Sequence, residues 1–581
     1  MPVTIGIDLG TTHSLCAVFR DGKPELIPNS HGEFLTPSVV GVLETREIVV
    51  GSTARELRIT HPERTSSCFK RFMGSDRKLR VADRTFSAHE LSSLVLKSLA
   101  ADAEAFLGEP IVDVVITVPA YFNDHQRQAT KLAGELANLH VRRIINEPTA
   151  AALVYGFHER HAEKQLCVID LGGGTFDVTV MEVFEGTLEI RATAGESMLG
   201  GEDFTDRIVS AVLSRQKQQL EVAELKQPLL VARLRAECEL AKRSLAKSES
   251  AKIRLPDANG EYSNTTTEFS ITRETFAKLC AALMQRIAIP VDRALRDAGC
   301  SPAEIDDVIM VGGATRMKLM TQQVQEYFQQ APRMDFNPDE VVALGAAVQA
   351  ALIDQDCAVE DIVMTDVCPF TLGVEIVKDL GGQIQDGYFQ PILHRNSTIP
   401  ISREEVFSTV MPNQSKVEIR VFQGDARRVK DNVELGQLSV QGLPPGPAGM
   451  PIHIRFSYDL NGLLEVEAYT PGGKKHSTVL TNHVKGLSPA QIQEAVRRLS
   501  ELKFYPREDL GNQHLARFCE RLVGELNTHR RQQLELALDE FESAMNVGDR
   551  GLFDNARTAL LMTLSSLGIE YDERSVDGDV N

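Results

Sequence analysis

Two glycine-rich segments of the sequence have the residue types of phosphate-binding hairpins. Ile7–Thr12 and Ile169–Thr175 each place an aspartate at the end of an apolar stretch, follow it with a Gly/Thr turn and lead into a second β-rich stretch. Glycine lets backbone N–H groups approach phosphate oxygens closely, and threonine hydroxyls add donors. The duplicated pattern therefore predicts two hairpins that enclose a triphosphate from both sides of a cleft.

The aspartates at the head of these segments are Asp8 and Asp170. Mg²⁺ keeps much of its water shell when it binds phosphates, so a carboxylate beside each turn can hold those waters. The segments are neither a Walker loop nor a Rossmann fingerprint, because both of those lead into a helix. A third glycine element, Ile309–Arg316, follows a β-rich stretch, and its glycines and arginine suit a flat base.

The surrounding sequence predicts the elements that position these segments. Short β-rich stretches alternate with helical patterns up to about Ile353, which is typical of an α/β domain. From Thr371 to about Asn482, short alternating stretches separated by turns predict a β-sandwich. Helical patterning then continues to about Leu567.

The composition excludes several classes of function. With 62 Lys and Arg against 81 Asp and Glu, the net charge of -19 argues against nucleic acid as the main partner. Nine cysteines occur without a CxxC pair, which favours free thiols in a reducing compartment over a zinc site. We expect a cytoplasmic protein with no membrane partner, because the sequence has neither a signal-peptide pattern nor an eighteen-residue apolar stretch.

Further motifs extend the pattern of the hairpins along the chain. Together the motifs are IGIDLGTT (5–12), VPAYFND (118–124), RIINEPTAAA (143–152), DLGGGTFDV (170–178), AGESMLGGEDF (194–204), CELAKRSL (238–245), VGGATR (311–316), NPDEVVALGAAVQAA (337–351), DVCPFTLGVE (366–375), NQSKVEIRVFQGD (413–425) and DLNGLLEVEA (459–468). These motifs resemble the DnaK-type seventy-kilodalton heat-shock chaperone family, and the shortened C-terminal helical region points to its HscC-like bacterial branch. The resemblance covers residues 3 to about 500.

This resemblance implies an ATP-dependent molecular chaperone, in which slow ATP hydrolysis controls the affinity for extended hydrophobic segments of client polypeptides. The implied cofactors are ATP or ADP and Mg²⁺. The implied partners are clients and a J-domain co-chaperone, with the exchange factor left open, and the chain is expected to be a monomer. The implied domains are an actin-like ATPase domain (1–356), a linker (357–367), a β-sandwich that binds peptide (368–486), a short helical lid (487–570) and a disordered tail (571–581).

The resemblance also assigns roles to residues at the nucleotide site. Lys70 would orient the attacking water, with Glu147 and Asp177 completing the polar cluster. Asp8 and Asp170 would hold the hydrated Mg²⁺. The other implied nucleotide contacts are Gly10, Thr11, Thr12, His13, Gly172, Gly173, Gly174, Thr175, Gly200, Gly201, Glu239, Lys242, Arg243, Gly312, Gly313, Arg316 and Asp339.

Two further groups of residues are implied outside the nucleotide site. In the expected sandwich, four apolar residues alternate to one face and match the peptide cleft, although such residues usually face the core; they are Phe407, Val410, Val417 and Ile419. A second group would connect the nucleotide site, the linker and the co-chaperone. It consists of Pro119, Arg127, Arg143, Asn146, Thr149, Asp361 and Asp366.

The sequence also departs from the family pattern. Ala246 and Ala314 replace polar residues near the expected adenosine site, which predicts weaker nucleotide retention. The stretch 378–390 is longer than usual and would alter one arch over the peptide cleft. Three alternative interpretations remain at this point: a small-molecule kinase with the same ATPase fold, a filament-forming actin relative, and a peptide holdase or exchange factor whose ATPase has decayed.

Overall fold

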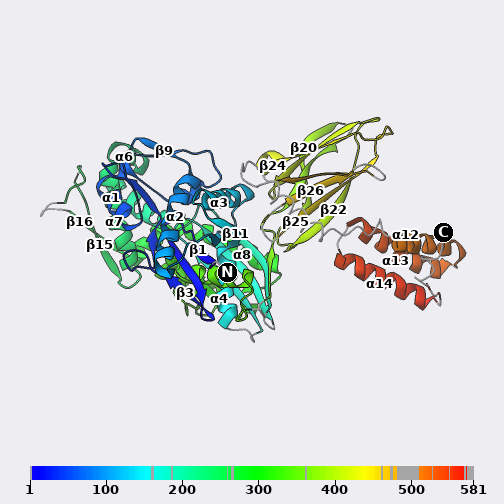
Figure 1. Ribbon diagram of the computed structural model, residues 1–581, viewed down its shortest axis with the longest axis horizontal. Helices are drawn as coiled ribbons and strands as arrows, with labels where there is room; N and C mark the ends of the chain where they lie inside the picture. Colours follow the sequence, from blue (N-terminus) through cyan, green and yellow to red (C-terminus); the bar gives the residue numbers. More distant parts are fainter. Residues whose placement is uncertain are drawn as a thin grey trace. The chain divides into compact units, whose positions relative to one another are not determined.

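A computed structural model shows the chain as two compact units, Met1–Pro369 and Phe370–Asn581 (Figure 1). Among the residues described, none of the helices combines the length and the apolar character that a bilayer crossing requires. The structure describes residues 3–158, 163–184, 187–257, 259–262, 267–359, 363–381, 383–459, 462, 464–470, 475–480, 510–526, 528–547, 550–567, 569 and 571.

The first sheet of unit 1 carries the first glycine hairpin. Its central strand β1 pairs in parallel with β10 and antiparallel with β2, so the chain turns back directly after Asp8. Ile5 and Ile7 are fully buried, which explains the continuous apolar character of this strand. The strand order is β11 (His140–Asn146), β10 (Asp113–Val118), β1 (Ile5–Asp8), β2 (His13–Arg20) and β3 (Lys23–Ile27).

The second sheet repeats this arrangement around the second hairpin. Its strand β12 pairs in parallel with β17 and antiparallel with β13, and Asp170 lies opposite Asp177. The expected duplication of the strand-turn-strand unit is therefore present in three dimensions. Within unit 1 the strand order is β17 (Asp307–Val311), β12 (Lys164–Leu171), β13 (Phe176–Phe184), β14 (Thr187–Glu196) and β18 (Val363–Val367).

Two helices of unit 1, α4 (Glu147–His158) and α10 (Val341–Ile353), pack directly on each other. A Cβ on Gly345 would lie 1.7 Å from the carbonyl oxygen of Ala150, so only glycine permits this approach. The same helix α10 contacts β1, where a Cβ on Gly6 would lie 2.3 Å from the backbone nitrogen of Ala347. These close approaches fix α4 and α10 against the first sheet.

The remaining elements of unit 1 surround the two sheets. Helices α1 and α7 contact each other, which brings an early and a late segment of the unit together. These elements are α1 (Ser52–Thr60), α2 (Ala88–Leu107), α3 (Asp124–Leu136), α5 (Gly201–Arg215), α6 (Leu220–Lys226), α7 (Pro228–Ser244), α8 (Arg273–Ala298), α9 (Lys318–Phe328), β4 (Thr36–Pro37), β5 (Val39–Val42), β6 (Ile48–Val50), β7 (Thr65–Ser67), β8 (Leu79–Val81), β9 (Arg84–Phe86), β15 (Ser250–Arg254), β16 (Glu268–Thr272) and the 3-10 turns Pro62–Arg64, Phe69–Phe72, Pro302–Glu304 and Gly313–Arg316.

Unit 2 begins with the expected β-sandwich. Its interior includes Ile452, Ile454 and Phe456, and the intervening polar residues His453 and Arg455 are buried as well. One sheet has the order β20 (Ile384–Leu393), β19 (Leu372–Asp379), β23 (Lys416–Gln423) and β24 (Val433–Gln441). The other has the order β22 (Ile401–Ser408), β25 (Pro451–Tyr458), β26 (Leu464–Tyr469) and β27 (His476–Leu480). The short strand β21 (Thr398–Ile399) and the 3-10 turn Val429–Asp431 complete this part.

The helical pattern predicted after the sandwich forms three helices among the described residues. They are α12 (Leu510–Glu525), α13 (Thr528–Val547) and α14 (Arg550–Ser566), which lie side by side (Figure 1). Their facing apolar side chains, including Leu515 and Phe541, form a separate core. The predicted start of this region at residue 487 lies outside the described residues, as do residues 572–581 of the predicted tail 571–581.

Candidate functional site

The two glycine hairpins meet face to face. A methyl group on Gly173 would lie 2.3 Å from Cγ2 of Thr12, and one on Gly174 would lie 2.5 Å from Cγ2 of Thr11. Such distances leave no room for any side chain on either glycine. The two Gly/Thr turns that the sequence analysis singled out therefore border one common site, although they are more than 150 residues apart in the sequence.

Two other predicted glycine elements join the hairpins. Helix α5 begins on the second hairpin, because Gly201 donates from its backbone nitrogen to the carbonyl of Gly172 at 2.9 Å. A Cβ on the preceding Gly200 would lie 2.4 Å from the nitrogen of Gly174. Gly312 has a φ of 81°, and a Cβ there would lie 2.6 Å from Oδ1 of Asp170. The third glycine element thus reaches the same site.

A buried lysine lies among the acidic side chains of this site. Lys70 Nζ lies 2.6 Å from Oε1 of Glu147, and both side chains are buried. Asp8, at the end of β1, accepts a hydrogen bond from Thr117 at 2.9 Å. Asp177 accepts one from the backbone nitrogen of Tyr121 at 3.0 Å. The structure therefore brings the predicted catalytic residues onto one polar surface beside the hairpins.

The carboxylates of this surface are held close together in a dry environment. Burial, followed by the negative charge of Glu147, raises the pKa of Asp177 to about 8. The same two causes raise the pKa of Asp8 and of Asp170 above the ordinary aspartate value. The positive charge of Lys70 acts in the opposite direction and lowers the pKa of all three aspartates. A hydrated divalent cation fits such a surface, because its charge would favour the ionised carboxylates.

The geometry of the site does not favour direct ligation of a metal ion by its side chains. Among the described residues, no three His, Cys, Asp or Glu side chains are arranged to ligate a metal ion together. Asp8 and Asp170 lie at the ends of two different strands on either side of the hairpin contact. This spacing suits a cation held through its waters, which is the role that the sequence resemblance implies for them.

The residues expected to contact adenosine form two charged clusters. Lys242 donates to the carbonyl of Gly201 at 2.7 Å and lies 2.6 Å from Glu239. Burial alone would raise the pKa of Glu239, but Lys242 and its hydrogen bonds lower it to about 2. Arg243 bonds the same carboxylate at 2.8 Å. The second cluster joins Gly313, Arg316 and Asp339, with the guanidinium 2.8 Å from the carboxylate.

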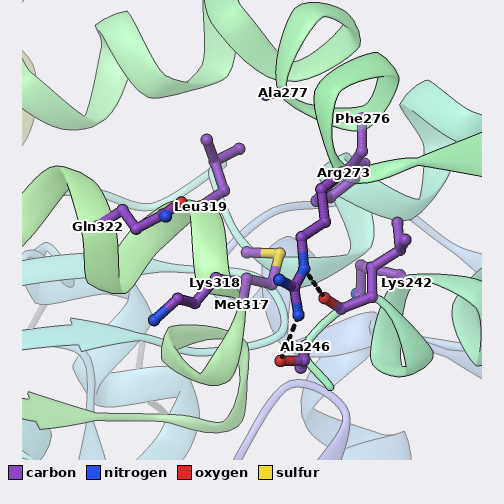
Figure 2. Close-up of a pocket in the computed structure, with 10 residues that line it drawn as sticks. Lys242, Ala246, Arg273, Phe276, Ala277, Met317, Lys318, Leu319 and Gln322 are labelled. Carbon is purple, nitrogen blue, oxygen red and sulfur yellow. Dashed lines mark hydrogen bonds between the residues drawn. The ribbon is translucent and has the colours of Figure 1, made fainter. Parts of the chain in front are cut away.

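A small cavity of about 40 Å³ adjoins these clusters (Figure 2). Its lining is mixed: Leu245, Phe276, Met317 and Leu319 are apolar, whereas Lys242, Arg273, Lys318 and Gln322 are charged or polar. Figure 2 shows Arg273 reaching across one side, where its guanidinium donates to the carbonyls of Leu245 at 2.8 Å and of Ala246 at 3.2 Å. Ala246, which replaces a polar residue, therefore contributes only its backbone oxygen here, and the predicted loss of nucleotide retention stays a prediction.

A chain of hydrogen bonds runs from the catalytic surface to the expected linker. Arg127 donates to the carbonyls of Ala120 and Phe122, which flank the Tyr121 nitrogen bonded to Asp177. The Nη2 of Arg127 that donates to Ala120 also donates to Oδ1 of Asn146, at 2.5 Å. Asn146 in turn donates to Asp366, which lies on β18.

The linker segment adds a strand to the second sheet. Strand β18 pairs in parallel with β14, with Met364 opposite Leu188. Burial raises the pKa of Asp366, while the Val367 nitrogen, Arg127 and Arg143 act in the opposite direction. The linker is therefore docked in this structure. Asp361, the other acidic residue predicted to flank the linker, lies outside the described residues.

The comparisons with known proteins agree with this geometry. A family model described as "Hsp70 protein" matches residues 4–81 and 76–547. The chaperone protein DnaK of Thermotoga petrophila is 43% identical over 514 residues, which cover 87% of this chain and 84% of the relative. DnaK of Thermotoga maritima gives the same values, and DnaK of Thermotoga neapolitana is 42% identical over the same length. The chain belongs to the Hsp70 family.

As a member of the Hsp70 family, the protein is an ATP-dependent chaperone that hydrolyses ATP. The family combines an actin-like ATPase domain with a substrate-binding domain, and its members bind ATP or ADP with a divalent cation. The duplicated sheets of unit 1 and the sandwich of unit 2 agree with this organisation. The small-molecule kinase and the decayed holdase are not favoured.

Several residues of the Hsp70 nucleotide site were missed by the sequence analysis. Arg71 donates to the carbonyl of Gly174 at 3.2 Å and forms an ion pair with Asp203, so it ties the second hairpin to the start of α5. Thr205 donates to Glu239 at 2.6 Å. Arg71 follows the predicted Lys70 directly, Asp203 lies within the quoted motif AGESMLGGEDF, and Thr205 follows that motif, so their positions next to predicted residues were the available signal.

The predicted peptide contacts do not share one face, which corrects the expectation from alternation. Phe407 lies on β22 of one sheet, whereas Val417 and Ile419 lie on β23 of the other, and Val410 lies in the loop after β22. Val410 is 42% exposed and Val417 partly exposed, whereas Ile419 is 3% exposed and packs in the interior. Alternation within a strand cannot tell which sheet the strand joins. Exposed apolar residues that the analysis missed are Val377, Leu380, Ile384 and Met411.

Strands β19 and β23 of this sheet form a fork. They pair only where Leu372–Val374 meets Val421–Gln423, although β19 continues to Asp379 and β23 begins at Lys416. Arg420 spans the fork by an ion pair with Glu375 at 2.7 Å. Thr149, which was assigned to the co-chaperone surface, is buried in the first turn of α4, so its side chain is not presented to a partner.

Proposed function

We propose that ATP binds between the two hairpins and that its hydrolysis controls an extended-peptide site in the sandwich. The observation that carries this proposal is the contact of Gly173 with Thr12 and of Gly174 with Thr11. Two glycine turns that meet at this distance surround phosphate oxygens with backbone N–H groups and hydroxyls. Mg²⁺ is the proposed cation, held through its waters by Asp8 and Asp170, and it would neutralise phosphate charge.

In the proposed reaction, water attacks the γ-phosphoryl group and ADP leaves. Catalysis of this kind depends mostly on positioning and charge neutralisation. Lys70 is fixed by its ion pair with Glu147, so its ammonium group can orient the water and stabilise charge on the phosphoryl oxygens. Asp177 is fixed by the Tyr121 nitrogen and would accept a hydrogen bond from the water.

We further propose that this reaction is sensed through the segment Pro119–Phe122. Any shift of Asp177 acts on the Tyr121 nitrogen, and Arg127 holds the carbonyls on both sides of that nitrogen. The same arginine bonds Asn146, the partner of the linker residue Asp366. A coupling free energy of about 1–3 kcal/mol between the two sites is enough for a useful switch.

The proposed peptide site is the fork between β19 and β23. A strand inserted there would find main-chain hydrogen bonds on both edges, which hold a peptide without regard to its sequence. Val417 and the exposed Val410 and Met411 lie on or beside β23 and would supply apolar pockets for alternate side chains. The longer stretch 378–390 includes the exposed Leu380 and Ile384 and would shape one rim of this site.

The proposed domain limits follow this division: ATPase domain 1–356, linker 357–367, peptide-binding sandwich 368–486, short lid 487–570 and tail 571–581. The proposed partners are client polypeptides and a J-domain co-chaperone that acts beside Arg143 and the docked linker. The departure from the family pattern at Ala246 supports the proposal of an HscC-like branch with a restricted set of clients.

The decisive experiment measures the release of a labelled hydrophobic peptide from the full-length chain with and without ATP. We expect ATP to accelerate release, and Val417→Phe to weaken peptide binding while ATP hydrolysis continues. Val406→Phe is the matched control, because Val406 lies on the other sheet and is already 41% exposed. Release that does not respond to ATP would refute the switch, and equal effects of the two variants would refute the location of the peptide site.

A further inference from the structure

We propose that His13 takes up a proton when the phosphates enter the cleft, which strengthens nucleotide binding and directs the Thr12 hydroxyl toward them. The inference depends on the proposed position of the phosphates between the hairpins. It assigns His13 as a positioning residue that acts through Thr12, and it makes the affinity for nucleotide depend on pH.

The position of His13 is the first support. It is the first residue of β2, directly after the Gly/Thr turn, and its Nδ1 lies 3.3 Å from Oγ1 of Thr12. Thr12 is the residue whose side chain lies against Gly173 of the opposite hairpin. His13 therefore touches the hydroxyl that lies where the two hairpins meet, and it pairs with Pro37 on its other side.

The charges that face His13 are the second support. Two come from α7, namely Arg243 and Glu239; Arg55 comes from α1, and Asp339 precedes α10. Burial, followed by Arg243, lowers the pKa of His13 to about 4, and Arg55 acts in the same direction against the two carboxylates. At neutral pH the imidazole of the nucleotide-free protein is therefore uncharged.

Nucleotide changes this balance. The two arginines and two carboxylates that face His13 carry opposite charges in equal number, whereas a nucleotide that carries Mg²⁺ still adds net negative charge close to the same ring. Nearby negative charge favours the protonated imidazole, so the pKa of His13 rises on binding. The proton comes from the solvent and forms an N–H bond on the imidazole; the nucleotide itself keeps all its bonds.

Protonation also settles the direction of the Thr12 hydrogen bond. A neutral imidazole can donate or accept at Nδ1, whereas an imidazolium only donates. When Nδ1–H donates to Oγ1 of Thr12, the hydroxyl hydrogen is free to point at a phosphate oxygen. The protonated ring thus prepares a donor on the hairpin that faces Gly173.

Linkage gives the expected pH dependence. Between the pKa of free His13, about 4, and the higher pKa of the nucleotide complex, binding consumes protons and tightens as the pH falls. Each pKa unit of difference gives about tenfold tighter binding at the acidic end of this range. Above the pKa of the complex, the contribution of His13 disappears.

The test is calorimetric titration of the full-length protein with MgADP between pH 5.5 and 8, in pairs of buffers that differ in ionisation enthalpy. The reference is His13→Asn, whose side-chain amide keeps a polar group at the place of Nδ1 and does not titrate; His13→Gln serves if that variant does not fold. We expect the wild type to take up a larger fraction of a proton than the variant, and its affinity to rise several-fold more on acidification. Protons that belong to the nucleotide cancel in this comparison.

Three outcomes would overturn the inference. Equal proton uptake by wild type and His13→Asn, with MgADP still bound, rejects the role of His13 while the proposed site stands. A loss of affinity in the variant that is the same at every pH assigns His13 a purely structural role. Absence of MgADP binding to the wild type removes the proposed function itself, and the inference with it.

Discussion

Asn146 donates a hydrogen bond from its side-chain amide to the linker residue Asp366, with Nδ2 3.1 Å from Oδ2. The two residues are 220 positions apart in the sequence. Asn146 ends β11 of the first sheet and Asp366 lies on β18 of the second, so a single contact joins the linker to both sheets of unit 1. Because Asp366 is buried by this docking, its ionisation and the docking of the linker must depend on each other.

Linker docking should weaken as the pH rises. Burial raises the pKa of Asp366 in the docked state above the ordinary aspartate value, so the docked state binds the proton more strongly than the undocked state. Docking is therefore strongest below the ordinary value and is lost progressively as the pH rises through the raised one. The extent of linker docking at each pH can be measured by hydrogen exchange of the backbone amides of Val363–Val367, corrected for the intrinsic pH dependence of exchange. Asp366→Asn should keep the linker docked at every pH, and an unchanged pH response in that variant would contradict the prediction.

Gly173→Ala should separate the hairpins. Its methyl group would lie 2.3 Å from Thr12, and relief of such a clash typically costs about 1–3 kcal/mol, which corresponds to about a 5- to 150-fold loss of affinity for MgADP. Gly172→Ala is the matched control, because its methyl group would meet Thr175 at an ordinary 3.7 Å. Equilibrium binding of MgADP to both variants decides the matter. If both variants lose affinity for MgADP equally, the contact between the two hairpins does not determine nucleotide binding.

Lys70→Ala should reduce single-turnover ATP hydrolysis by about 10²–10³-fold, because it removes a charge that stabilises the transition state. Affinity for MgADP should change far less. Lys252→Ala, which removes an exposed lysine on β15, is the control and should hydrolyse ATP normally. Full turnover by Lys70→Ala would contradict the assigned role.

The same variant also leaves Glu147 buried without its partner, which typically costs about 3–5 kcal/mol of stability. The double variant Lys70→Met/Glu147→Gln removes that unpaired charge. We expect it to recover much of the unfolding temperature of the ATPase unit without recovering hydrolysis. Recovery of hydrolysis as well would mean that Lys70 acts only through stability.

The stability of the sandwich should also depend on a buried polar network, as the stability of the ATPase unit depends on the pair Lys70–Glu147. Arg455 lies 2.6 Å from Glu404, which also accepts a hydrogen bond from Tyr469 and contacts His453. Arg455→Met removes the guanidinium partner of the buried carboxylate, although Tyr469 and His453 still contact it, and should lower the free energy of unfolding of this unit by about 1–3 kcal/mol. Adding Glu404→Gln should restore part of that loss in urea titrations, and a double variant less stable than the single one would contradict this explanation.

The nucleotide hairpins were predictable because their signal is local. Asp8 and Asp170 are each delivered by an apolar strand into a Gly/Thr turn, and the repetition of this short pattern is visible in the sequence. Contacts that depend on the approach of distant segments were not. Thr117 donates a hydrogen bond to Asp8, which lies 109 positions away in the sequence, and the periodicity of the sequence does not predict this pair.

In the sandwich, too, the sequence predicted local structure but not which distant strands pair. The sequence indicated strands and their buried sides, since Ile452, Ile454 and Phe456 alternate as expected. It did not indicate that Phe407 and Val417 belong to different sheets, because partner choice depends on the whole topology. The polar residues between those apolar ones, such as Arg455, are also buried, which alternation along the strand does not indicate.

In the proposed peptide site, the fork leaves Glu375–Asp379 of β19 and Lys416–Arg420 of β23 without a strand partner on their facing edges. Open β edges of this kind promote adhesion between unrelated chains. The Glu375–Arg420 ion pair lies next to the last paired residues and holds the two strands together there. Loss of this pair would lengthen the exposed edges and favour self-association of the chaperone.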